Sequence, residues 1–182
     1  MKLDILDRDG VINQDSDNFI KSVDEFIPLP GSIKAIARLK HAGYQVYIAT
    51  NQSGIYRGFY DEATLHAMHE KLAILLKEHD AEIDGIEFCP HGPDDHCNCR
   101  KPKAGMYLNI AKRAGLTNLS EALVVGDSLR DLQAAQSVNA KPHLVRTGKG
   151  ERTIKKGEGL NGIPVYNDLA DFVKQLLNGT IN

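Results

Sequence analysis

The sequence contains no tryptophan, and aromatic residues make up only 6% of it. Proteins that bind single-stranded nucleic acid stack its bases on exposed aromatic rings, so this scarcity argues against such a surface. The formal net charge of -2 at pH 7 also lacks the basic excess that a polyphosphate backbone would attract. We therefore expect no nucleic-acid partner.

Long hydrophobic runs are also missing. No apolar run approaches the roughly 20 residues that a membrane-spanning helix needs. Asp4 and Asp7 interrupt the apolar start that a secretory signal would have. We expect a cytoplasmic protein without a membrane partner. Its 182 residues, 42% of them hydrophobic, suit one globular domain over residues 1–182. The lack of an obvious apolar surface stripe favours a monomer.

Short apolar runs alternate with amphipathic stretches along the chain. The predicted strands cover residues 3–6, 46–50, 83–88, 122–125, 143–145 and 164–166. Segments with helical spacing cover residues 32–42, 61–80, 105–114, 129–137 and 169–177. This alternation predicts an α/β fold with a doubly wound, Rossmann-like parallel sheet and helices on both faces. Residues 147–162, rich in Gly, Lys and Glu, are predicted to form a mobile loop.

Acidic side chains follow two of the predicted strands. Asp7 and Asp9 come directly after the first strand, and Gly10 then permits a sharp turn. Asp127 follows the fourth strand, with Asp131 one helical turn later. Ligands bind beyond the carboxyl ends of parallel strands, so we expect these acids to converge. Their mutual repulsion would be relieved by a divalent cation, and hard oxygen ligands favour Mg²⁺.

Other residues of the predicted crevice suit phosphoryl transfer. Thr50 and the backbone amides near Asn51 follow the second strand and can bind phosphate oxygens. Lys101 can neutralise a phosphoryl group and hold Asp7. An oxygen of Asp7 can then attack phosphorus, while Asp9 protonates the leaving alcohol and later activates water. The pattern predicts a phosphohydrolase that works through a phospho-aspartate.

Four short motifs occur in order along the chain. They are Asp-Arg-Asp-Gly at 7–10, Thr-Asn at 50–51, Arg-Lys-Pro at 100–102 and Gly-Asp-x-x-x-Asp at 126–131. Together they resemble the motifs of the haloacid dehalogenase-like phosphatases. The resemblance implies the fold of that family, and no insertion in this chain is long enough to form a large cap domain. It also implies that Asp131 orients the groups around the metal.

The resemblance further implies a role for each of the remaining motif residues. It makes Asp7 the nucleophile, Asp9 the general acid and base, and Thr50 the phosphate-binding threonine. Lys101 is the lysine of the third motif. The implied ligands of Mg²⁺ are Asp7, the backbone carbonyl of Asp9, and Asp127.

All three cysteines fall within residues 89–99. An odd number in one tight cluster favours metal ligands over disulfides. The sequences Cys-Pro-His and Cys-Asn-Cys offer three thiolates and one imidazole, a closed set that suits a small loop holding structural Zn²⁺. The expected ligands are Cys89, His91, Cys97 and Cys99. His96 is an alternative to His91, which is preferred because Cys-x-His pairs symmetrically with Cys-x-Cys. Zinc is expected to turn Arg100 and Lys101 toward the crevice.

Longer motifs narrow the resemblance to the histidinol-phosphatase-related subfamily. They are Asp-Arg-Asp-Gly-Val-Ile-Asn, Thr-Asn-Gln-Ser-Gly-Ile, Cys-Pro-His, Cys-x-Cys-Arg-Lys-Pro and the Gly-Met at 105–106. The narrower resemblance implies a small-molecule sugar bisphosphate as substrate, with loss of the 7-phosphate from a heptose 1,7-bisphosphate that supplies lipopolysaccharide cores. Without a cap, compact loops must recognise the sugar, and the Arg100 guanidinium suits the non-reacting phosphate. The expected substrate-binding residues are Asp15, Ser16, Asp17, Asn18, Thr50, Asn51, Gln52, Ser53, Arg100, Lys101 and Ser128.

Several alternatives stay open at this point. Ser128 stands where some family members have lysine, so its role is undecided, as is that of Arg57. A histidinol-phosphate phosphatase would share the motifs, and acids within residues 15–18 could bind its amine. A phospho-accepting receiver domain also gathers acids, threonine and lysine around Mg²⁺, but its acids usually follow the first and third strands. A zinc-binding interaction module would leave the carboxylates unexplained.

Overall fold

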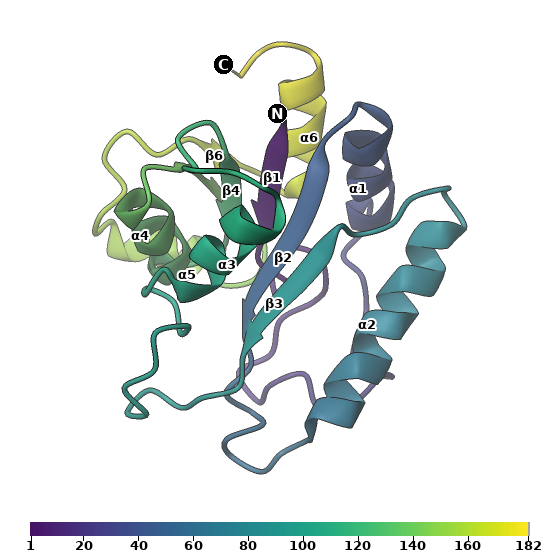
Figure 1. Cartoon of the computed structure of the whole chain (residues 1–182), viewed down its shortest axis with the longest axis vertical. Coiled ribbons are helices and arrows are strands. Elements are labelled where there is room, and N and C mark those ends of the chain that lie inside the picture. Colours follow the sequence, from purple (N-terminus) through teal and green to yellow (C-terminus); the bar gives the residue numbers. More distant parts are fainter. Residues whose placement is uncertain (182) are drawn as a thin grey trace.

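The computed structural model describes residues 1–181. A six-stranded parallel sheet forms its centre, in the order β3-β2-β1-β4-β5-β6 (Figure 1). The strands are β1 (Leu3–Leu6), β2 (Gln45–Asn51), β3 (Gly85–Cys89), β4 (Leu123–Gly126), β5 (Lys141–Val145) and β6 (Val165–Tyr166). The doubly wound α/β architecture predicted from the alternation of apolar runs is thereby confirmed.

Helices cover both faces of the sheet (Figure 1). One face packs against α1 (Ser32–His41), α2 (Glu62–Lys77) and α6 (Leu169–Leu177). The other packs against α3 (Gly105–Arg113) and α4 (Leu129–Ser137). Each buried strand therefore has apolar side chains on both sides, which explains its nearly continuous hydrophobic sequence. Among the described residues, no helix combines the length and apolar character needed to cross a bilayer.

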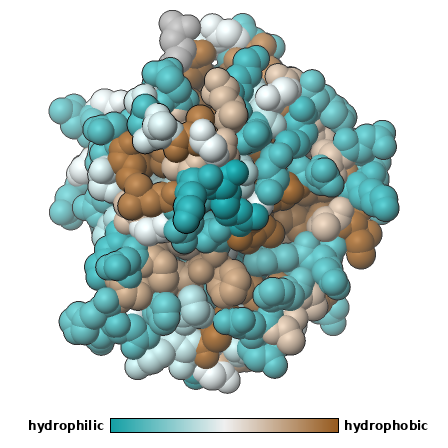
Figure 2. All heavy atoms as spheres, in the orientation of Figure 1, coloured by the Kyte–Doolittle hydropathy of each residue, from teal (hydrophilic) through white to brown (hydrophobic). Residues whose placement is uncertain are grey.

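The surface is mixed in character. Figure 2 shows one face on which hydrophobic areas are separated by hydrophilic ones. The large hydrophobic side chains that are exposed lie on different elements and loops. They are Met1, Ile27, Tyr56, Phe59, Ile74, Leu108 and Val165.

The remaining helix, α5 (Gly150–Lys156), lies at the carboxyl edge of the sheet. The prediction of a loop over residues 147–162 was therefore wrong for this stretch. The helix is anchored by contacts far apart in sequence: the Thr153 hydroxyl donates to the Asp127 carbonyl, and the Lys149 amide donates to the Asp127 carboxylate, both at 2.8 Å. Its short, polar sequence has no apolar stripe, so these tertiary contacts are needed to stabilise it.

The order of the strands reverses beside β1. The chain runs from β1 outward to β3, returns to β4 on the other side of β1, and continues to β6. The crevice beyond the carboxyl ends of β1 and β4 lies at this reversal, which is where doubly wound sheets bind ligands. Asp7 directly follows β1 and Asp127 directly follows β4, so the fold brings the two predicted acids to one place.

A buried histidine far from that crevice gives the fold a pH dependence. His143 on β5 is 4% exposed, and its ring centroid lies 5.9 Å from that of Tyr166 and 5.0 Å from that of Phe172. Burial lowers the pKa of His143 to about 4. Its unfolded pKa is about 6.5, so the unfolded chain binds the extra proton first as the pH falls.

We expect His143→Phe to reduce the sensitivity of the fold to acid. The stabilisation from the neutral ring is complete above about pH 6.5 and is lost as the pH falls toward about 4. Between pH 7 and pH 4 the wild type should lose about 3 kcal/mol more unfolding free energy than the variant. Urea unfolding at both pH values measures this, and equal losses in the two proteins would contradict it.

Candidate active site and metal centre

A cavity of about 250 Å³ lies at the carboxyl edge of the sheet and contains most of the predicted site. Its lining includes the acids after β1 and β4, the residues that end β2, and the lysine that follows the cysteine cluster. The lining residues predicted from the sequence are Asp7, Asp9, Asp15, Ser16, Asp17, Thr50, Asn51, Gln52, Ser53, Arg57, Arg100, Lys101, Asp127, Ser128 and Asp131. Asn18 is outside this lining, and its backbone amide donates to Ser16 Oγ at 3.1 Å.

Asp7 is held at the floor of the cavity. Its backbone amide donates to the Val125 carbonyl at 3.0 Å, which ties the end of β1 to β4. Its Oδ1 receives the Arg8 amide at 2.8 Å and the Lys101 ammonium at 3.0 Å. Burial and the nearby Asp131 carboxylate raise the pKa of Asp7 to about 7, although Lys101 acts in the opposite direction. A bound cation would therefore favour the ionised form of Asp7.

Lys101 is 2% exposed and connects several groups of the site. Its Nζ lies 3.0 Å from Asp7 Oδ1 and 2.7 Å from Asp131 Oδ1, and it donates to the Ala49 carbonyl at 2.7 Å. Burial opposes its charge, but the two carboxylates outweigh this effect and raise the pKa of Lys101. The ammonium group is therefore a fixed positive charge at the base of the cavity.

Asp127 completes the acidic group. Burial and the Asp7 and Asp131 carboxylates raise its pKa well above the ordinary value. A Cβ placed on Gly10 would lie 2.1 Å from Asp127 Oδ2, and one on Gly148 would lie 2.3 Å from the same atom. Only glycine fits at these two positions, so the backbone can surround the carboxylate closely.

Carboxylate oxygens of Asp7, Asp127 and Asp131 lie within 4.8 Å of one another. The two oxygens of Asp131 are already engaged, since Oδ1 meets Lys101 at 2.7 Å and Oδ2 accepts from the Asp127 and Ser128 amides at 3.1 Å each. The Ser128 hydroxyl also donates to Oδ2 at 3.0 Å, and the bond from the Ser128 amide to the same oxygen is part of the capping box of α4. Asp131 thus fixes its neighbours, while the acids after β1 and β4 fit a hard divalent cation.

Asp9 has a different environment. Its Oδ1 accepts from Arg8 Nε at 3.0 Å, Arg8 Nη2 at 2.8 Å and Asn13 Nδ2 at 2.8 Å. Its Oδ2 accepts from Gln52 Nε2 at 3.0 Å. Burial opposes ionisation of Asp9, but the Arg8 guanidinium and these amide donors outweigh it and lower the pKa. Asp7 and Asp9 therefore have pKa values shifted in opposite directions, because Asp9 is paired with a buried guanidinium whereas Asp7 lies beside other carboxylates.

The residues that end β2 bind other parts of the site. Asn51 forms a pair of hydrogen bonds with the Lys101 backbone, accepting its amide at 3.0 Å and donating to its carbonyl at 3.2 Å. Gln52 donates to Asp9 Oδ2 at 3.0 Å and to Thr50 Oγ1 at 2.9 Å. The Tyr60 hydroxyl donates to Oε1 of the Gln52 side chain. The amides of Asn51 and Gln52 thus hold site residues in place.

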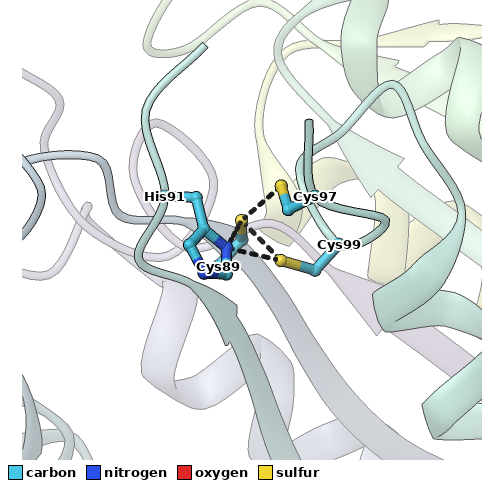
Figure 3. Close-up of side chains that lie close together, drawn as sticks. All are labelled: Cys89, His91, Cys97 and Cys99. Atoms are coloured by element: carbon cyan, nitrogen blue, oxygen red, sulfur yellow. Dashed lines mark hydrogen bonds between the residues drawn. The ribbon is translucent and has the colours of Figure 1, made fainter. Parts of the chain in front are cut away.

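The four predicted zinc ligands meet on one loop (Figure 3). Cys89 and His91 come from the end of β3, and Cys97 and Cys99 come from the facing limb, with the side chains turned toward one another. Cys89 Sγ lies 3.5 Å from His91 Nδ1 and 3.7 Å from Cys97 Sγ. Zinc–sulfur bonds of about 2.3 Å place tetrahedral sulfurs about 3.8 Å apart. The Cys89–Cys99 sulfurs, at 2.7 Å, would have to separate around an ion.

Cationic groups surround the outer part of the cavity. Arg57, Arg100 and Arg130 line it, and burial together with the other two guanidinium groups lowers the pKa of Arg100. The acids of the 15–17 loop are paired instead: Asp15 lies 3.3 Å from Lys149 Nζ, and Asp17 accepts two bonds from Arg152 at 2.8 Å each. The outer part of the cavity therefore presents three guanidinium groups that suit a second anionic group.

Some residues of the site were missed by the sequence analysis. They are Arg8, Asn13, Tyr60, Arg130 and Lys149. Their positions between or beside the motifs were the one available signal. Arg130 and Lys149 reach the cavity because α4 and α5 begin at its edge, and nothing in the local sequence indicates that direction.

Comparison with known proteins agrees with this geometry. Residues 3–139 match the family model of the haloacid dehalogenase-like hydrolases. A D-glycero-beta-D-manno-heptose-1,7-bisphosphate 7-phosphatase from Bordetella bronchiseptica is 54% identical over 177 residues, covering 97% of this chain and 98% of the relative. The enzyme of the same name from Pseudomonas aeruginosa is 54% identical, covering 95% and 96%.

Solved structures give the same relationship. The D,D-heptose 1,7-bisphosphate phosphatase of Bordetella bronchiseptica, complexed with magnesium and phosphate, superposes with a TM-score of 0.95 at 54% identity, covering 98% of this chain and 99% of that one. The corresponding enzyme from Burkholderia thailandensis gives a TM-score of 0.76 at 44% identity, covering 97% and 99%. With its matching family model, sheet topology and clustered acids, the chain belongs to the haloacid dehalogenase-like hydrolase family.

Proposed function

We propose that this chain is a Mg²⁺-dependent phosphatase that removes the 7-phosphate of D-glycero-β-D-manno-heptose 1,7-bisphosphate through a phospho-aspartate. The observation that carries the proposal is the similarity to three phosphatases of that name, at 52–54% identity over at least 95% of each chain. The names of these relatives also favour the β anomer, which the sequence alone left open.

The residues that would hold Mg²⁺ are Asp7, Asp127 and the backbone carbonyl of Asp9. Once bound, Mg²⁺ supplies positive charge that offsets the charge of the transferring phosphoryl group. Lys101 contributes a second, permanent positive charge beside Asp7, at 3.0 Å. Among the described residues, the donors to the Asp7 carboxylate are the Arg8 amide and the Lys101 ammonium, and both bind Oδ1. Oδ2 is therefore the oxygen that we expect to attack phosphorus.

The reaction then proceeds in two steps. Asp7 Oδ2 forms a bond to phosphorus while the bond to the sugar 7-oxygen breaks, and Asp9 gives that oxygen a proton. Asp9 next removes a proton from water, which attacks the phospho-aspartate and releases phosphate. The Thr50 hydroxyl accepts the Gln52 side-chain amide at 2.9 Å and would bind a phosphoryl oxygen throughout.

The charge around the outer cavity favours a bisphosphate over histidinol phosphate. Arg57, Arg100 and Arg130 offer guanidinium groups for the 1-phosphate, which each can bind through two N–H groups. An amine substrate would instead need a free carboxylate. Asp15 and Asp17, the acids considered for that role, are paired with Lys149 and Arg152. A receiver domain is not favoured either, because the chain belongs to a hydrolase family.

A phosphate-release panel tests the proposed substrate. We expect Mg²⁺-dependent release of one phosphate from the β anomer of the heptose bisphosphate, with the 1-phosphate kept on the product, as phosphorus NMR would show. The α anomer, histidinol phosphate and fructose 1,6-bisphosphate are the comparison substrates, and chelation of Mg²⁺ should stop the reaction. Preference for histidinol phosphate, or release of the 1-phosphate, would overturn the proposal.

We also propose that the Cys89, His91, Cys97 and Cys99 cluster holds a structural Zn²⁺. Their ligand atoms lie within 4.8 Å of one another, and four protein ligands leave no position open for catalysis. The loop they form leads directly into Arg100 and Lys101. We therefore propose that zinc fixes this segment while the Asn51 side chain binds its Lys101 backbone from β2.

A matched pair of substitutions tests the zinc site. His91→Asn should lower the zinc content from one equivalent per chain to a small fraction and reduce thermal stability, because metal binding adds to folding free energy. His96→Asn should keep the metal, since His96 is outside the cluster. Metal analysis of both purified variants decides the matter. Zinc retained by the His91 variant and lost by the His96 variant would assign the fourth ligand to His96.

We propose that residues 1–182 form one catalytic domain and that the protein is a monomer. We also propose that it acts in the cytoplasm, in the synthesis of activated heptose for lipopolysaccharide cores. The scatter of exposed hydrophobic side chains over several elements supports the monomer. Size-exclusion chromatography with light scattering measures the oligomeric state directly.

A further inference from the structure

One cation near the site lies outside the proposed chemistry. Arg8 stands between Asp7 and Asp9 in the sequence, yet its side chain is completely buried, at 0% exposure. Arginine is rarely buried unless its charge is paired. Among the described residues, Asp9 is the one carboxylate that forms an ion pair with it, at 2.8 Å.

The far side of the Arg8 guanidinium is held by residues from other elements. Nη1 lies 3.5 Å from Met68 Sδ and 3.3 Å from His69 Nε2, both on α2. The guanidinium carbon lies 5.3 Å from the centroid of the Phe26 ring. These contacts fix the plane of the guanidinium, so its direction does not depend on Asp9 alone.

The near side of Arg8 acts on one oxygen of Asp9. Nε and Nη2 both donate to Oδ1, at 3.0 and 2.8 Å, and Asn13 Nδ2 adds a third donor at 2.8 Å. Oδ2 has a different neighbour, Gln52 Nε2 at 3.0 Å, and Gln52 lines the cavity whereas Arg8 does not. The two oxygens are therefore distinct: Oδ1 faces the protein interior and Oδ2 faces the cavity.

We propose that Arg8 is a positioning residue for proton transfer: by occupying Oδ1 from the buried side, it keeps Oδ2 of Asp9 directed toward the leaving oxygen of the substrate. The inference rests on the proposed function for the role of Asp9. The two N–H groups of the planar fork converge on Oδ1 and hold that oxygen from two directions. A lysine ammonium would supply its charge from one point and hold Oδ1 less rigidly.

The leaving group of the substrate distinguishes this role from a purely structural one. A sugar alkoxide is a poor leaving group and needs a proton as it departs, whereas p-nitrophenolate departs without one. The quantity to compare is kcat/KM, which covers the steps up to release of the alcohol and does not include hydrolysis of the phospho-aspartate. A residue that acts through proton donation affects the first substrate selectively, whereas general disruption of the fold affects both.

The test compares Arg8→Lys with the wild type on the heptose bisphosphate and on p-nitrophenyl phosphate. We expect kcat/KM to fall about 100-fold for the sugar substrate and about 3-fold or less for the aryl phosphate, within the range that general acid catalysis contributes. Arg113→Lys is the control, because Arg113 pairs with Glu87 and packs over Tyr47 away from the cavity. It should leave both values unchanged. Equal losses for both substrates in Arg8→Lys, or no loss, would overturn the inference.

A second variant covers the case in which Arg8→Lys does not fold. His69→Leu removes one of the two acceptors of Arg8 Nη1, leaving Met68 Sδ, and it leaves the Arg8–Asp9 pair intact. It should lower the ratio of sugar to aryl kcat/KM by about 3-fold, and an unchanged ratio would count against the inference. If the wild type does not hydrolyse the heptose bisphosphate, the proposed function fails. The same ratio can then be measured with any alkyl phosphate that the enzyme does accept, so Arg8 is still tested.

Discussion

Asp7→Asn is expected to lower kcat by about 10⁴-fold or more while the protein remains folded. The amide oxygen of asparagine cannot form the bond to phosphorus that the carboxylate forms, so the first chemical step is lost. The wild-type enzyme, quenched during turnover, should carry a phosphoryl group on the peptide that contains Asp7. Mass spectrometry detects that group, and the variant should lack it.

Asp7→Asn should also change the thermal stability of the protein in the absence of Mg²⁺. Burial and the Asp131 carboxylate raise the pKa of Asp7 to about 7. A raised pKa means that its stabilising contribution is complete at low pH and is lost as the pH rises toward 7. At pH 8 the ionised carboxylate therefore destabilises the metal-free fold, and Asp7→Asn should unfold at an equal or higher temperature.

Asp84→Asn serves as a control for both measurements. Asp84 forms an ion pair with Lys40 and lies outside the cavity lining. The Asp84→Asn variant should therefore keep full activity. Turnover by Asp7→Asn within 100-fold of the wild type (about 3 kcal/mol of barrier) would contradict the assignment of the nucleophile. So would a phosphoryl group found on another residue.

Lys101→Met should lower both the unfolding free energy and the kcat by large amounts. The change removes the positive charge that meets Asp7 at 3.0 Å and Asp131 at 2.7 Å. Breaking a buried pair by removing one partner costs about 3–5 kcal/mol, because the remaining charge has no compensation. We expect that loss at pH 8 and a smaller one at pH 5, because the pKa of Asp7 is about 7 and its carboxylate can take up a proton. The kcat should fall by about 10³-fold, since charge on the phosphoryl group is no longer offset.

Urea unfolding at the two pH values and steady-state kinetics measure these effects. Lys112→Met is a suitable control, because Lys112 is exposed on α3 and lies outside the cavity lining. Full activity in Lys101→Met would show that Mg²⁺ alone provides the positive charge. Equal destabilisation at both pH values would show that the Asp7 and Asp131 carboxylates are not what the lysine compensates.

The site shows why some of its residues were predictable and others were not. Asp7, Thr50 and Asp127 end or follow strands whose apolar sequences mark their own limits, so the position of each at the sheet edge could be predicted. The zinc ligands share an 11-residue segment, so their proximity is nearly independent of the fold. In both cases the signal is local.

Other residues depend on contacts that the local sequence does not contain. Arg8 would ordinarily be assigned to the surface, but the pairing with Asp9 and the contacts from α2 make its burial possible. Asn51 lines the cavity, and its side chain also holds the Lys101 backbone, 50 residues away. Helix α5 forms because Asp127 anchors it.

The sequence by itself determined the alternation of strands and helices, the acids at the strand ends and the composition of the cysteine cluster. These follow from short-range properties: apolar periodicity, turn-forming glycines and the spacing of ligand pairs. Only the tertiary structure decided which oxygen of each aspartate faces the cavity, and which cations are available for a second phosphate. The reason is that hydrogen-bond partners and burial are set by neighbours distant in sequence, and these determine both the direction of a carboxylate and its pKa.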